Sequence, residues 1–181
     1  VVEHADVRGI AGAKHLWAQK LDPDGLPLWG AGHKQVFDLA GGSLQFGNFP
    51  GFETDGVGGA VFAWYTSSPS LQVRAQHLVG AGTEVFAHNG VEVSTDGSQL
   101  RVDPSAAFDP ESGEVTVFWV EENSLQTQHG LYGQRLDGGG QIAGLLSDER
   151  LERALEFDFF FIFGFAEGRT SFELGTPERE H

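Results

Sequence analysis

The chain has 181 residues, of which 11 are Lys or Arg and 26 are Asp or Glu, so its formal net charge is −15. Nucleic acids and anionic membrane surfaces both attract basic faces, and the charge therefore argues against either partner. The chain lacks cysteine, which excludes disulfides, thiolate metal sites and cysteine nucleophiles. Its longest apolar run, residues 159–163, is far too short to span a bilayer, and membrane insertion is not expected. Methionine is absent even at position 1, which suggests that the chain begins inside a longer reading frame or after processing.

The first clear element is a strand at residues 16–21, followed by an Asp-Pro-Asp-Gly turn at residues 22–25. The weakly patterned residues 1–13 before it are predicted to be the end of a preceding repeat unit. A similar strand and glycine-closed turn recur at residues 73–82 and 131–140. The central glutamines Gln19, Gln76 and Gln134 stand 57 and 58 residues apart (76 − 19 and 134 − 76). A fixed internal spacing of this size is typical of repeat architectures.

A second feature repeats between these strands. Residues 50–64 and 104–119 each contain a proline, a short strand, an Asp-containing hairpin with glycine, and an apolar strand that leads to Trp64 or Trp119. Nearly continuous apolar strands are usually covered on both faces, so both tryptophans are expected in a core between units. Turn chemistry is sufficient to explain Asp55 and Asp109, which open the two hairpins.

One unit is therefore predicted to contain four short antiparallel strands, and the predicted fold class is all-β. Four-stranded units repeated about every 57 residues favour β-propeller-like repeats. Residues 14–144 hold two full repeats and part of a third, whereas a closed propeller has about four to eight blades. We therefore expect an incomplete propeller that covers its faces with neighbouring repeats or by self-association.

The C-terminal segment, residues 145–181, departs from this pattern. A short helix is predicted at residues 147–156, because Ser147 is a suitable N-cap and Leu151 and Leu155 share a face. Residues 157–165 alternate phenylalanine with other residues, which predicts a strand. This segment is either a degenerate blade, an altered reading frame or a truncated end.

The repeated motifs together resemble a family of repeats common in large secreted and cell-surface bacterial proteins. The matching positions are Pro50, residues 55–60, residues 63–64, residues 74–76, Gly82, Phe86 and residues 89–93. The resemblance covers about residues 14–144 and implies a propeller-like all-β fold and an extracellular or cell-surface location. The family has no agreed catalytic residues, so the resemblance transfers none.

The recurring polar and aromatic positions are the candidate ligand-binding residues. The glutamine amides either bond to backbone or make a repeated polar contact to a sugar. One further repeat position holds a tryptophan, an arginine and a tyrosine in the three copies, which suggests either a surface face that stacks on sugar rings or packing in the core or at its rim. The candidate set is Trp17, Gln19, Arg74, Gln76, Tyr132 and Gln134.

No catalytic residue, metal site or cofactor is predicted, because zinc spacings, nucleophile elbows and phosphate loops are missing from the sequence. The predicted function is a non-catalytic binding or display scaffold of an exported bacterial protein. Its expected partner is a glycan or a surface protein, and not a nucleic acid. The alternatives are a carbohydrate-active hydrolase that uses the central pocket of a propeller, and a structural spacer.

Overall fold

A computed structural model describes residues 2–7, 12–45, 49–94, 100–127 and 129–143. Contacts divide the chain into Val1–Leu146 and Ser147–His181, and every described residue belongs to the first part. The described residues form strands and no helix, which confirms the predicted all-β class. No helix in this part of the chain is therefore long and apolar enough to cross a membrane. The helix and strand predicted at residues 147–165 lie outside the described residues.

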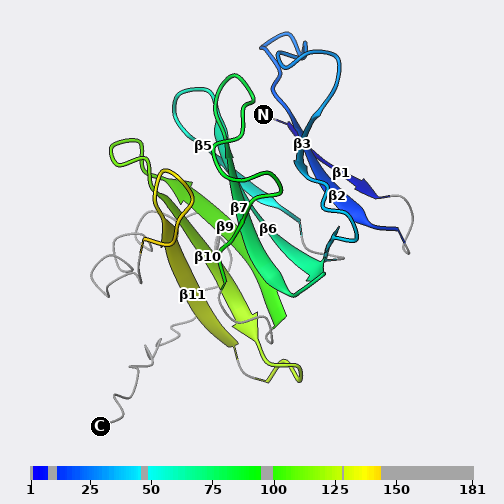
Figure 1. The fold of residues 1–181 in the computed structure, drawn as a ribbon, viewed down its shortest axis with the longest axis vertical. Helices are drawn as coiled ribbons and strands as arrows, with labels where there is room; N and C mark the ends of the chain where they lie inside the picture. Colours follow the sequence, from blue (N-terminus) through cyan, green and yellow to red (C-terminus); the bar gives the residue numbers. More distant parts are fainter. Residues whose placement is uncertain (1, 8–11, 46–48, 95–99, 128, 144–181) are drawn as a thin grey trace, which may run out of the picture. The chain divides into compact units, whose positions relative to one another are not determined.

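The first sheet, called sheet 1, contains the first of the three glutamine strands. It consists of β1 (Val2–Val7), β2 (Lys14–Gln19) and β3 (Lys34–Phe37) in that order (Figure 1). Both pairings are antiparallel, and β1 pairs with β2 along its whole length. Residues 2–7 thus share a sheet with the glutamine strand that follows them.

Sheet 2 contains five strands, and β6 is paired on both of its edges. It is built from β4 (Ser43–Leu44), β5 (Gly51–Thr54), β6 (Ala60–Ser68), β7 (Gln72–Leu78) and β8 (Val91–Glu92). Both β4 and β5 pair with β6, and β7 lies between β6 and β8. All these pairings are antiparallel.

Sheet 3 consists of three strands, β9 (Leu100–Phe108), β10 (Val115–Glu122) and β11 (His129–Leu136), with β10 in the middle. Its strands follow one another as β5, β6 and β7 do in sheet 2. Each strand runs antiparallel to the next, as Figure 1 shows. The described residues form these three separate sheets and no closed ring of sheets.

The turns after β2, β7 and β11 have the same hydrogen bonds. In each turn the glycine N–H donates to the carbonyl oxygen of the first turn residue. The N–H of that first residue donates to the carbonyl oxygen of the residue after the glycine. The closing glycines have φ of 83°, 77° and 81°, which glycine adopts without strain. The glycine bonds are Gly25 to Asp22 at 3.0 Å, Gly82 to Val79 at 2.7 Å and Gly140 to Asp137 at 2.9 Å.

Two apolar clusters join the sheets, and β6 contributes to both. Because side chains alternate along a strand, Val61 and Ala63 enter the cluster shared with sheet 3, whereas Phe62 and Trp64 enter the cluster shared with sheet 1. Trp119 lies in the first of these clusters and is 5 % exposed. The prediction that residues 60–64 are covered on both faces is confirmed, as is the burial of both tryptophans between sheets.

Candidate functional site

Gln19 fastens the loop that follows its own strand. Its Oε1 accepts the backbone N–H of Lys20 at 3.0 Å and that of Trp29 at 3.1 Å. Its Nε2 donates to the carbonyl oxygens of Gly30 at 3.0 Å and Gly32 at 2.7 Å. The side-chain amide therefore closes the returning chain back onto β2.

Gln76 makes the equivalent contacts in sheet 2. Its Oε1 accepts the N–H groups of His77 at 2.9 Å and Phe86 at 3.1 Å. Its Nε2 donates to the carbonyl oxygen of Ala87 at 3.0 Å. Gln76 is fully buried, and Gln134 is 5 % exposed with its Nε2 3.4 Å from the Arg135 carbonyl oxygen. Of the two roles considered for the glutamines, bonding to backbone is the one that the structure shows at Gln19 and Gln76.

We expect Gln76→Leu to lower the free energy of unfolding by about 2 kcal/mol, because buried N–H groups of His77 and Phe86 lose their acceptor. Gln19→Leu is the matched control, since it removes the same clamp beside the exposed Gly30 and Gly32, where water can replace the amide. Urea unfolding followed by far-UV circular dichroism measures both losses. Equal losses would contradict a cost set by burial.

The shared aromatic or arginine position differs in exposure among the three sheets. Trp17 is partly buried, and Tyr132 is 48 % exposed and stacks on Trp119 with ring centroids 6.3 Å apart. Arg74 is only 9 % exposed, forms an ion pair with Glu92 at 2.5 Å, and donates to the Asn89 carbonyl oxygen. Of the two alternatives for this position, the surface face fits Tyr132, and packing in the interior fits Arg74.

A histidine joins the end of β3 to the loop after β7. His88 Nδ1 lies 3.0 Å from both carboxylate oxygens of Glu84, and its Nε2 lies 2.9 Å from Asp38 Oδ1. Asp38 also donates its backbone N–H to Asn89 Oδ1 at 2.7 Å. The hydrogen bond with Glu84 raises the pKa of His88; burial opposes this, and Asp38 adds to the increase. A protonated ring donates to both carboxylates at once.

The raised pKa of His88 predicts a stability that depends on pH. Because its pKa in the folded chain is above its unfolded value of about 6.5, the stabilisation is complete below that value and is lost as pH rises through the folded pKa. The side chain is 50 % exposed, so we expect a loss below about 1 kcal/mol. Urea unfolding of the wild type between pH 5.5 and 8.5 should show this loss, and His88→Gln should remove it. A variant with the same pH profile would contradict the assignment.

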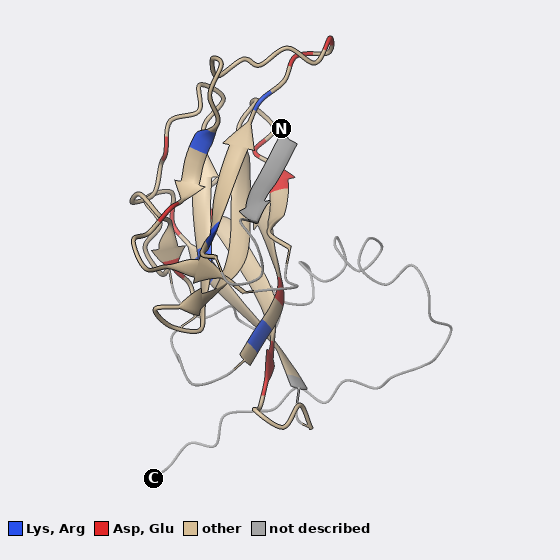
Figure 2. Ribbon diagram, turned by 90° about the vertical axis from the view of Figure 1, so that its right-hand side faces the viewer, with Lys and Arg blue, Asp and Glu red and all other residues tan. Residues whose placement is uncertain are grey.

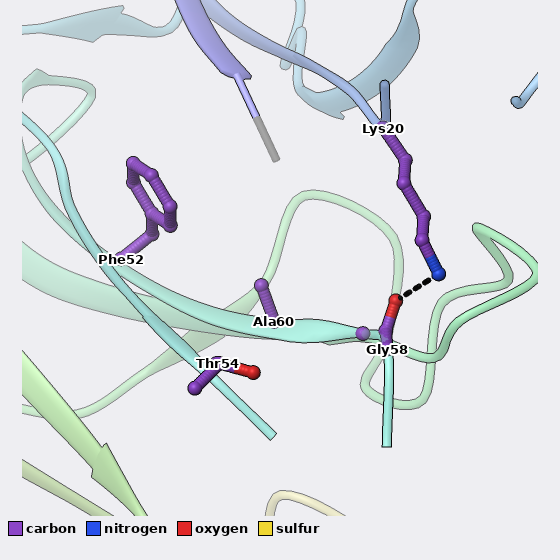
Figure 3. A pocket seen from close by; sticks show the side chains of 6 residues that line it. Lys20, Phe52, Thr54, Gly58 and Ala60 are labelled. Atoms are coloured by element: carbon purple, nitrogen blue, oxygen red, sulfur yellow. Dashed lines mark hydrogen bonds between the residues drawn. The ribbon is translucent and has the colours of Figure 1, made fainter. Parts of the chain in front are cut away.

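A hollow of about 200 Å³ opens where sheet 1 meets the hairpin between β5 and β6. Lys20, the residue after β2, lines it and donates to the Gly58 carbonyl oxygen at 2.6 Å (Figure 3). Phe52 is 43 % exposed and packs on Phe62 with ring centroids 5.9 Å apart. The residues that line the hollow are Lys20, Phe52, Thr54, Gly58, Gly59 and Ala60.

Asp55 shapes the hairpin beside this hollow. Its Oδ1 accepts the N–H groups of Val57 at 2.9 Å and Gly59 at 2.7 Å, and its Oδ2 lies 3.2 Å from His77 Nε2. Burial raises the pKa of Asp55, but the hydrogen bonds from Val57, His77 and Gly59 together lower it below its ordinary value. In the equivalent hairpin, Asp109 Oδ1 accepts the N–H of Glu111 at 2.9 Å. The turn roles predicted for both aspartates are confirmed.

The sequence-based candidate set did not include Lys20 or Phe52. Lys20 shares its repeat position with His77 and Arg135, and this recurrence of basic side chains was a usable signal. Phe52 offered none, because the equivalent residue in sheet 3 is Ala106. Among the described residues, no group of three or more His, Asp or Glu side chains is arranged to hold a metal ion.

No protein-family model matches this chain, and no curated protein or solved structure matches it either. The function must therefore be inferred from the contacts of the molecule itself.

Proposed function

We propose that the chain is part of a non-catalytic binding scaffold built from β-propeller-like repeats with a spacing of about 57 residues. The proposal rests on the same local structure at matched positions. Glycine turns follow β2, β7 and β11, and glutamine side chains on β2 and β7 bond to the backbone of the loop that follows each strand. Repeat units of this kind cannot bury their apolar faces alone and need neighbours. The two-sided cover of β6 supports such an arrangement.

We propose a glycan as the ligand of this scaffold, on an exported bacterial protein at the cell surface. Two aromatic side chains beside polar groups, Phe52 and Tyr132, are 43 % and 48 % exposed. An aromatic ring offers a flat apolar face to the C–H groups of a sugar ring. Where a scaffold repeats, several weak contacts of this kind add up through avidity.

A glycan array tests this function directly. We expect the wild-type chain to be retained on a subset of glycans, and the double variant Phe52→Ala/Tyr132→Ala to be retained less. Mass spectrometry of the retained glycans should show them unchanged. Shortened products would favour the hydrolase instead, and a silent array with a folded chain would favour the spacer.

A further inference from the structure

The place between sheets 2 and 3 that corresponds to the hollow beside Lys20 is filled by a pair of aromatic rings. The strand registers place Thr54 opposite Ala60 and, in the same way, Phe108 opposite Val115. The equivalents of Lys20 and Thr54 are therefore His77 and Phe108, whose rings pack with centroids 5.0 Å apart. Thr54 and Lys20 leave the corresponding place open between sheets 1 and 2.

Several of the residues that line the hollow have small side chains or none, and this leaves its space unfilled. Gly58, Gly59 and Ala60 line it together with Thr54, and Figure 3 shows the Lys20 side chain extending to the Gly58 carbonyl oxygen, with Phe52 on a separate segment, β5. At Gly58 a Cβ would lie 2.8 Å from Lys20 Nζ. A side chain at this position would therefore push the ammonium group aside.

Among the described residues, no carboxylate forms an ion pair with the ammonium group of Lys20. It donates a hydrogen bond to the uncharged Gly58 carbonyl oxygen at 2.6 Å. The adjacent Glu53 alternates to the other face of β5 from Phe52 and Thr54. Acidic residues are spread over the strands and loops of the described chain (Figure 2), so Lys20 is a positive charge on a protein whose formal net charge is −15.

We propose that this hollow binds the carboxylate-bearing sugar unit, a hexuronate, of an acidic glycan; this rests on the proposed glycan-binding function. The sugar ring packs on the exposed side of Phe52, its carboxylate pairs with Lys20, and a hydroxyl bonds to Thr54. The net charge of −15 opposes an acidic ligand at long range. At physiological salt such repulsion is screened beyond about 8 Å, whereas a direct charge-assisted contact is not.

Isothermal titration with a glucuronate-containing oligosaccharide and with its carboxyl-reduced form tests this proposal. The two probes differ only in the change of each carboxylate to a CH₂OH group. We expect the acidic form to bind about tenfold more tightly, the change that one charge-assisted hydrogen bond produces. Lys20→Gln should remove this difference, and Phe52→Ala should weaken the binding of both forms.

Two matched variants control for charge and for aromatic content. Lys34→Gln removes the same charge from sheet 1 outside the hollow, and Phe49→Ala removes a phenylalanine that is 85 % exposed and does not line it. Both should bind the acidic form like the wild type. Equal affinity for the two probes, or wild-type affinity in Lys20→Gln, would overturn the proposal and leave the glycan-binding function intact. If the chain binds neither probe and no glycan on the array, the proposed function fails as well.

Discussion

Trp64→Ala is expected to lower the free energy of unfolding by about 3–5 kcal/mol, the cost of emptying a large aromatic site in a core. Trp64 is fully buried in the cluster shared by sheets 1 and 2, and its ring lies 5.8 Å from that of Phe37. Its ring also fills the space beside Gly90, where a Cβ would lie 2.5 Å from it. Urea unfolding followed by far-UV circular dichroism measures the loss without depending on tryptophan fluorescence.

Trp29→Ala is the control for this experiment. Trp29 is partly buried, and its indole N–H donates to the Gly80 carbonyl oxygen at 3.1 Å. It therefore also links sheet 1 to sheet 2, but from the rim of the cluster, and its removal should cost less than half as much. If the two variants lose the same stability, Trp64 is not the centre of the contact between these sheets.

Gly59→Ala is expected to destabilise the chain by about 3 kcal/mol, near the upper end of what overpacking usually costs. A Cβ at this position would lie 2.2 Å from the Leu78 carbonyl oxygen and 2.3 Å from Asp55 Oδ2. The Leu78 oxygen belongs to the backbone at the end of β7, so relief requires a strand to move. The displaced carboxylate would also lose the N–H groups of Val57 and Gly59.

The same substitution at Gly32 separates this clash from a general effect of alanine. Neither glycine has φ in the left-handed region, and a Cβ at Gly32 meets nothing within 4 Å. Gly32→Ala should leave the urea midpoint within experimental error. A Gly59→Ala chain as stable as Gly32→Ala would show that β7 and the hairpin do not approach each other this closely.

The features within one hairpin were predictable from the sequence. The aspartate turns follow from local turn chemistry, and the two-sided burial of residues 60–64 follows from their apolar run. The recurrence of Gln19 and Gln76 was visible, but their role was not. An amide that bonds to backbone and one that bonds to a sugar have the same sequence pattern, so only the positions of Trp29 and Phe86 decide between them.

The contacts between sheets were not predictable in the same way. Trp29, in the loop after β2, donates its indole N–H to the Gly80 carbonyl oxygen, 51 positions further along the chain. The hollow depends on Lys20 reaching Gly58, 38 positions further along the chain. Such contacts depend on how one sheet lies on the next, which no local pattern specifies.

The glutamine bonds close short loops, and short loops lose less conformational entropy on closure than long ones. The bonds from Gln19 and Gln76 to their returning loops span 10 to 13 positions, whereas the bonds that join sheet 1 to sheet 2 at Lys20, Trp29 and Asp38 span 38 to 51. Each doubling of a loop adds roughly 0.6 kcal/mol of closure entropy. The hairpins are therefore the local, low-contact-order elements of the chain, and the bonds between sheets bear the larger entropic cost of ordering it.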